Sequence, residues 1–198
     1  VLFSHRLFGK EPHIFSFHFH TWNTNITNFT IKQLSDDCDT KIRVRNFLFS
    51  QIRSEYGYGY IPSWHKDIID LNKYYIDCKK NSLFYVEDSD NGRIIATIAV
   101  RQYDKNFMEF QDLYSKESTA SIWRLFVDKY YRRCGLATQL YDVVEKFCCE
   151  NNFNEIYLHT HKNLEAGFSF WKKVGFNVTW DTNNELQTVH MVKNLSSK

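Results

Sequence analysis

Short runs of apolar residues, several of them alternating with polar residues, divide the chain into segments that favour β-strands. The runs lie at residues 29–34, 83–86, 94–100, 122–127, 156–158, 176–180 and 187–192. A further alternation, of Phe with Ser or His at 15–20, predicts an additional strand near the N-terminus. Asn91 and Gly92 lie between two of the runs, and this pair favours the tight turn of a β-hairpin. The turn at 181–184 predicts a second hairpin, which closes the chain.

Four other segments carry apolar residues at the spacing of an amphipathic helix. The first follows the capping residues 35–37, the second spans about 63–78, the third carries Leu136, Leu140, Val143, Val144 and Phe147, and the fourth spans about 164–173. After the N-terminal strand, the order of elements is β-α-α-β-β-β-α-β-α-β-β, which predicts a mixed α/β sheet. No linker rich in Gly, Ser or Pro interrupts it, so we expect an N-terminal extension at 1–27 and one domain at 28–198.

Composition and charge narrow the classes of function. The chain has 198 residues, of which 43% are hydrophobic, and a formal net charge of +2. This balance gives no basic stripe, so we expect no nucleic-acid partner. No run of about 18 apolar residues occurs, and the first residues lack the apolar core of a signal peptide, so we expect no membrane partner either.

Cysteine and histidine usage bears on the compartment and on metals. The five cysteines are odd in number and contain no Cys-x-x-Cys pair, which indicates reduced thiols and a cytoplasmic protein. His18 and His20 would share one face of the N-terminal strand, as metal ligands or as solvated side chains. No Cys, Asp or Glu stands beside them at ligand spacing, so we predict no metal site.

The segment that follows the strand at 122–127 carries the clearest chemical pattern. A loop with Arg132 and Arg133 leads through Gly135 into the third helix. The N-terminus of a helix presents unpaired N–H groups, and glycine lets a ligand approach the backbone closely. This arrangement favours a phosphate or pyrophosphate site, although an ordinary strand-to-helix turn with two surface arginines is the alternative. Neither a P-loop nor a G-x-G-x-x-G pattern is present.

Arg132, Gly135 and Ala137 match the [QR]-x-x-G-x-[GA] pattern of the GNAT acyltransferase superfamily, which the chain resembles. The preceding residues 124–128 look like that family's fourth strand, and residues 170–176 look like its Tyr-Glu-Lys-x-Gly-Phe segment. The resemblance implies a mostly antiparallel α/β sheet of about seven strands with four flanking helices, here with one extra N-terminal strand. It also implies acetyl-CoA as the acyl donor.

The resemblance further implies which residues hold the donor. The strand edge would pair with the pantetheine arm and supply an N–H group to the thioester carbonyl, and the loop would hold the pyrophosphate. These residues are Leu125, Phe126, Val127, Arg132, Arg133, Cys134, Gly135, Leu136, Ala137 and Thr138. The expected reaction is direct transfer of the acetyl group to a primary amine of a small molecule, amino acid or peptide.

Two positions depart from the family's pattern. Trp171 stands where the family often has a tyrosine that protonates the leaving thiolate, and Ser121 stands where it often has a glutamate. His159 and His161 alternate on the strand near 156–161 and are our candidates for the catalytic acid or base. Simple hydrogen bonding in the sheet is the alternative role for both. Weaker candidates are Glu109, Glu117, Tyr131 and Tyr157.

By the same resemblance, the loop between the first two helices should bind the acceptor. It carries Tyr56, Tyr58, Tyr60 and His65, together with Trp64 and Asp67. Aromatic rings and a carboxylate could receive a cationic amine, or the rings could pack the two helices together. Because the usual Tyr and Glu are missing, a catalytically degenerate domain that binds acyl-CoA as a sensor or interaction module is the second hypothesis. A homodimer through an edge strand is a further expectation.

Overall fold

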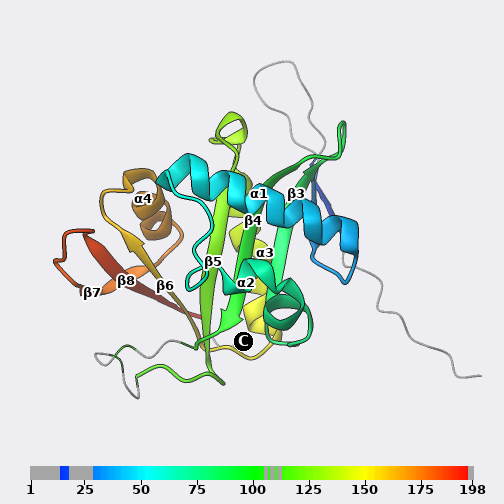
Figure 1. Cartoon of the computed structure of the whole chain (residues 1–198). Helices are drawn as coiled ribbons and strands as arrows, with labels where there is room; N and C mark the ends of the chain where they lie inside the picture. Colours follow the sequence, from blue (N-terminus) through cyan, green and yellow to red (C-terminus); the bar gives the residue numbers. More distant parts are fainter. Residues whose placement is uncertain (1–13, 18–28, 105–106, 108–109, 111–112, 196–198) are drawn as a thin grey trace, which may run out of the picture.

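The computed structural model describes residues 14–17, 29–104, 107, 110 and 113–195. Its strands are β1 (Ile14–Phe17), β2 (Phe29–Gln33), β3 (Ser82–Asp88), β4 (Ile94–Gln102), β5 (Thr119–Val127), β6 (Glu155–His161), β7 (Asn177–Asp181) and β8 (Thr188–Asn194). Its α-helices are α1 (Cys38–Tyr56), α2 (Lys66–Ile69), α3 (Leu136–Glu150) and α4 (Glu165–Lys173). This order confirms the predicted fold class (Figure 1).

The strands form one sheet in the order β1-β2-β3-β4-β5-β6-β8-β7. Every neighbouring pair is antiparallel except β5 and β6, which are parallel. The extra N-terminal strand is confirmed, because β1 pairs with β2 along its whole length. His18, His20 and Glu109 lie outside the described residues.

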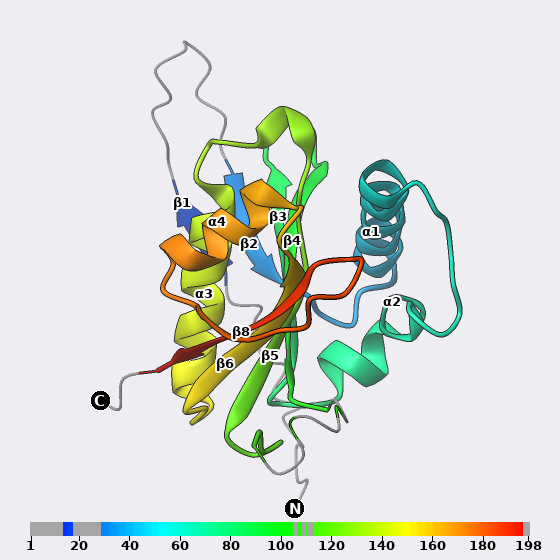
Figure 2. The same ribbon diagram turned by 90° about the vertical axis from the view of Figure 1, so that its left-hand side faces the viewer.

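Helices cover both faces of the sheet. Figure 2 shows α1 and α2 on one face and α3 and α4 on the other. Val44, Leu48 and Ile52 of α1 are almost fully buried in the first layer, and Leu140 and Val144 of α3 in the second. Because both of their faces are covered, β3 and β4 are buried nearly throughout. Within the described residues, no helix combines the length and the apolar character that crossing a membrane requires.

The second predicted helix, at 63–78, is interrupted. The structure has α2 at Lys66–Ile69, followed by a π-helical turn at Asn72–Ile76. Asp70 lies between them with φ −113° and ψ 71°, and its carboxylate accepts a 3.1 Å hydrogen bond from the Lys73 amide. Aspartate often starts a new helical segment in this way, because its side chain replaces a lost backbone partner.

Candidate active site

Strand β5 carries a bulge in its second half. The β4–β5 ladder shifts register after Trp123, so that Arg124 and Leu125 together face one residue of β4. Arg124 adopts the left-handed backbone conformation with φ 52°. The Thr97 hydroxyl on β4 donates a 2.9 Å hydrogen bond to the Arg124 carbonyl oxygen. A bulge of this kind redirects the backbone groups of its strand.

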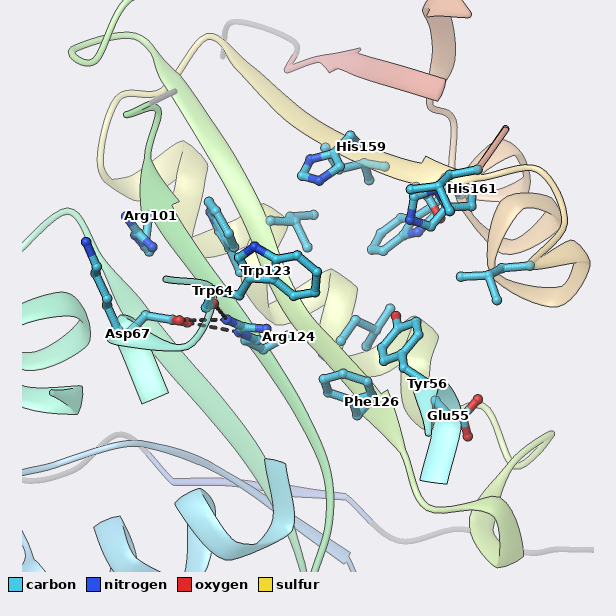
Figure 3. A pocket seen from close by; sticks show the side chains of 18 of the residues that line it. Glu55, Tyr56, Trp64, Asp67, Arg101, Trp123, Arg124, Phe126, His159 and His161 are labelled. Atoms are coloured by element: carbon cyan, nitrogen blue, oxygen red, sulfur yellow. Dashed lines mark hydrogen bonds and ion pairs between the residues drawn. The ribbon is translucent and has the colours of Figure 1, made fainter. Parts of the chain in front are cut away.

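On its other edge, β5 pairs with β6 over three residues only, and this ladder ends at Ser121 and Tyr157. Beyond that point the two strands are no longer paired, and a cavity of about 1280 Å³ lies between them and α1. Its lining includes Ile122, Trp123, Arg124, Leu125 and Phe126 from β5, and Leu158, His159, Thr160 and His161 from β6. Figure 3 shows His159 and His161 facing Trp123, Phe126 and Tyr56 across this cavity.

The N-terminus of α3 lies just beyond the end of β5. Gly135, with φ 80°, is its N-cap, and no side chain caps the helix. The first helical hydrogen bond runs from the Gln139 amide to the Gly135 carbonyl, so the amides of residues 136–138 have no partner inside the helix. A Cβ built at Gly135 would approach only the flexible end of Gln139. These features fit an anionic ligand such as a pyrophosphate.

The two loop arginines differ in their surroundings. Arg132 donates a 3.0 Å hydrogen bond from Nε to the Val127 carbonyl and forms an ion pair with Glu55 at the end of α1. It therefore connects the loop to β5 and α1. Arg133 is exposed and has a positive φ of 64°, which turns the chain towards Gly135.

The two candidate histidines both line the cavity. His159 is exposed and stacks on His190 of β8, with ring centroids 5.9 Å apart. His161 is half-buried, and its Nδ1 lies 3.2 Å from the Thr188 hydroxyl. The described residues contain no group of three or more His, Cys, Asp or Glu that could hold a metal ion.

The other acid-base candidates lie in less suitable places. Trp171 lines the cavity, but it is buried against Tyr141 and Phe176 and its indole carries no acidic hydroxyl. Ser121 is fully buried within the sheet, where β5 pairs with both β4 and β6. The weak candidates that the structure describes lie away from the cavity lining. Glu117 bonds to Ser115, the Tyr131 hydroxyl to Asp88, and the buried Tyr157 hydroxyl to His190.

Aromatic residues at the end of α1 and in the loop after it form one wall of the cavity. Tyr56 and Tyr58 stack with ring centroids 5.6 Å apart and both line it, as does Trp64. Tyr60 and His65 pack behind this wall and do not reach the cavity lining. His65 is 1% exposed, and its Nδ1 accepts a 2.9 Å hydrogen bond from the Ile61 amide. Burial lowers the pKa of His65, assisted by the charge of Arg124, so its ring is neutral at pH 7.

A buried ion pair joins this wall to the bulge. Arg124 donates from Nε and Nη2 to the two carboxylate oxygens of Asp67, at 3.0 and 2.7 Å, and from Nη2 to the Trp64 carbonyl (Figure 3). The Tyr75 hydroxyl donates to the same carboxylate at 2.5 Å. Burial opposes ionisation of Asp67, but the hydrogen bonds and positive charge of Arg124, together with the hydrogen bond from Tyr75 and the charge of Arg101, outweigh it and hold the pKa of Asp67 below its usual value. Asp67 is therefore committed to Arg124, rather than to an incoming amine.

Sequence reasoning missed two residues near the cavity. Arg101 of β4 lines it between two aromatic rings, and the buried His190 of β8 stands behind His159. His190 pairs directly with His159 in the β6–β8 register. A single sequence carries no signal for these placements, because they depend on which residues face each other across separate strands.

Comparisons with known proteins agree on one family. Residues 46–176 match the model described as Acetyltransferase (GNAT) family. N-acetyltransferase 8 from Homo sapiens is 25% identical over 138 residues, a match that covers 66% of this chain and 57% of that protein. The chain thus spans little more than half the length of that curated relative.

Solved structures show the same fold. A GNAT-family acetyltransferase from Staphylococcus aureus Mu50 superposes with a TM-score of 0.65 at 19% identity, covering 84% of this chain and 99% of that one. An acetyltransferase from Streptococcus agalactiae gives a TM-score of 0.67 at 18% identity, covering 84% and 98%.

Proposed function

We propose, from the premise that this chain belongs to the acetyltransferase (GNAT) family, that it transfers an acetyl group from acetyl-CoA to a primary amine of a small molecule, amino acid or peptide. The observation that carries the proposal is a combination of two features. Strand β5 has a bulge and is unpaired along the β6 edge of its second half. The N-terminus of α3, which no side chain caps, follows shortly after β5. Acetyl-CoA would supply an acetyl group already activated as a thioester.

The donor would be held by backbone groups. Amides at the start of α3 would receive the pyrophosphate, and the open positive-φ backbone at Gly135 leaves room for it. The edge of β5 at Leu125, Phe126 and Val127 is free of β6 and would pair with the pantetheine arm. One of these fixed N–H groups would stabilise negative charge on the acyl oxygen as the amine attacks.

The amine must lose a proton when its nitrogen forms the new bond. His159 and His161 line the cavity from the β6 side, opposite the aromatic wall, and one of them would take this proton directly or through water. The buried Trp171 supplies no proton to the leaving thiolate. A thiolate is a good enough leaving group to depart with solvent as its acid.

Binding of acetyl-CoA tests the donor site, and Gly135→Glu is the informative variant. Glutamate places a carboxylate and a side chain where the pyrophosphate would approach the α3 amides. We expect the wild type to bind acetyl-CoA by isothermal titration calorimetry, and Gly135→Glu to bind it at least tenfold more weakly.

Gly92→Glu is the matched control, because Gly92 also has a positive φ, 68°, and open space at its Cβ, but lies in the β3–β4 turn. It carries the same backbone strain and should bind acetyl-CoA like the wild type. Equal affinity of all three proteins would refute the assigned donor loop. Binding without CoA release from any amine in a pooled screen would instead favour the second hypothesis, a non-catalytic acyl-CoA sensor.

A further inference from the structure

Arg101 is a charged residue that lines the cavity and yet is almost completely buried. Its side chain is only 8% exposed, and its guanidinium carbon lies 4.7 Å from the ring centroids of both Tyr74 and Trp123. Cation–π contacts of this kind hold the guanidinium against the two rings. Its N–H donors point outward in the plane of the group, so a carboxylate binds along its edge.

The edge has one protein partner in the part of the chain that the structure describes. Arg101 Nη2 forms a short hydrogen bond to Asp104, three residues further along. The Asp104 side chain is 41% exposed, and an ion pair with such an exposed partner is weak. Solvent therefore reaches the carboxylate that occupies the edge, and another carboxylate could replace it at little cost.

The position of Arg101 on β4 indicates how far the edge of its guanidinium lies from the proposed reaction centre. Arg101 faces Ser121 in the β4–β5 ladder, and Ser121 precedes Leu125 of the bulge by four residues. At about 3.3 Å per residue the two positions on β5 are roughly 13 Å apart. An anion bound at Arg101 would therefore lie several bonds away from an amine that attacks at the bulge.

We propose that the edge of the Arg101 guanidinium is an acceptor subsite for a carboxylate, and that Asp104 occupies it when the acceptor is absent. The inference rests on the proposed acetyl transfer and specifies its substrate class: amines that carry a carboxylate several bonds from the amino group. Arginine suits this role, because its planar fork binds a carboxylate through two parallel hydrogen bonds.

Two dipeptides of nearly equal shape test the proposal. Glycyl-phenylalanine ends in a carboxylate and glycyl-phenylalaninamide does not, whereas their amino groups have similar surroundings. With saturating acetyl-CoA, we expect kcat/KM for the acid to exceed that for the amide by roughly tenfold to hundredfold, since hydrogen bonds between charged groups contribute about 1.5–3 kcal/mol.

Variants locate the effect. Arg101→Gln should bring the two peptides to nearly equal kcat/KM while leaving KM for acetyl-CoA unchanged. Asp104→Asn should raise kcat/KM for the acid several-fold and leave the amide unchanged, because it removes the competing carboxylate. Asp104 is exposed, so this variant remains informative even if Arg101→Gln folds poorly. Asp90→Asn, which removes an exposed aspartate in the β3–β4 turn, is the matched control and should change neither peptide.

The results separate the subsite from the reaction. Equal kcat/KM for the two peptides in the wild type, or a lower value for the acid in Asp104→Asn, overturns the carboxylate subsite and leaves the proposed function standing. If neither peptide is acetylated, calorimetry on the CoA-loaded protein decides, and failure to bind the acid at millimolar concentration also overturns it. Absence of acetyl-CoA binding, or of CoA release with every amine, contradicts the proposed function itself.

Discussion

Arg124 performs two structural roles at once. Its backbone accepts a left-handed conformation that costs a non-glycine residue roughly 1–2 kcal/mol, and its side chain forms a forked ion pair with the buried Asp67. The second role stabilises the first, because the fixed guanidinium restricts the strand from returning to a regular ladder. Strained backbone of this kind persists where surrounding contacts determine it.

Removing one partner of this ion pair should be costly. Asp67→Asn leaves the Arg124 charge buried without its counterion, and we expect the free energy of unfolding to fall by about 3–5 kcal/mol. Urea denaturation measures it. Glu150→Gln, which removes one partner of an ion pair whose side chains are both 62% exposed, is the control and should change stability by less than about 1 kcal/mol. Similar losses in both variants would contradict this assignment.

The same pair predicts a pH dependence. The pKa of Asp67 in the folded protein lies below the ordinary value of 3.8, so on acidification the unfolded chain takes up this proton first. The contribution of Asp67 to stability is therefore complete above pH 3.8 and is lost as pH falls through the folded-state pKa. Unfolding free energies measured across this acid range should fall less steeply in Asp67→Asn than in the wild type.

The candidate histidines can be separated by kinetics. If one of them removes the proton from the amine, its replacement by glutamine should lower kcat by about a hundredfold or more and change the pH profile. His159→Gln and His161→Gln serve as controls for each other, because both side chains line the same cavity from one strand. Unchanged rates and pH profiles in both variants would exclude either as the base.

For individual residues, the sequence predicted those site residues whose neighbours in the structure are also their neighbours along the chain. Arg132 and Gly135 could be located because a strand, a loop and a helix follow one another without interruption. Arg101 and His190 could not, because their partners come from other strands or from the π-helical turn, and pairing register is set by the assembled sheet. For Asp67 the residue was found, but its partner Arg124 lies 57 positions away.

Among the elements, those with clear boundaries were predictable. Asp37 caps α1 by accepting from the Thr40 amide at 2.7 Å, and Gly92 turns between β3 and β4 with a positive φ. The interruption of the helix predicted at 63–78 was harder to predict. The apolar spacing there is helical, but the Asp70 side chain accepts a hydrogen bond from the Lys73 amide and breaks the helix. The bulge in β5 gave no sequence signal, since its positive-φ residue is an arginine rather than a glycine.

The role of the β5 bulge can be tested by removing the Thr97 hydroxyl, which donates a hydrogen bond to it. Thr97→Val removes the hydrogen bond to the Arg124 carbonyl with little change in shape, and should destabilise the fold by about 1 kcal/mol. We expect kcat to fall severalfold with KM for acetyl-CoA nearly unchanged, because a looser bulge positions its N–H group less well.

Thr119→Val, on the neighbouring strand β5, provides the comparison. Thr119 is also fully buried, and its hydroxyl donates to Glu155 at 2.7 Å, away from the bulge. It should cost similar stability with no loss of kcat. Equal losses of kcat in both threonine variants would show that the bulge has no special role in turnover.

For the whole molecule, the order of elements predicted a mixed α/β sheet, and the resemblance to the GNAT superfamily implied that this sheet is mostly antiparallel with flanking helices. The cavity was not predictable at this scale, because it exists only where β5 and β6 stop pairing after three residues. The sequence of either strand alone favours a longer ladder.

The left-handed Arg124 has a consequence for directed evolution. A library selected for heat resistance alone would reward any sequence that lets β5 run straight, since a regular strand avoids the strain and forms a longer ladder. Because single changes at Asp67 or Thr97 lower stability, such winners would have to replace Arg124, Thr97 and Asp67 together, and we expect them to lose turnover as they gain stability. A selection that alternates heat with activity should instead leave these three positions unchanged and improve the surface.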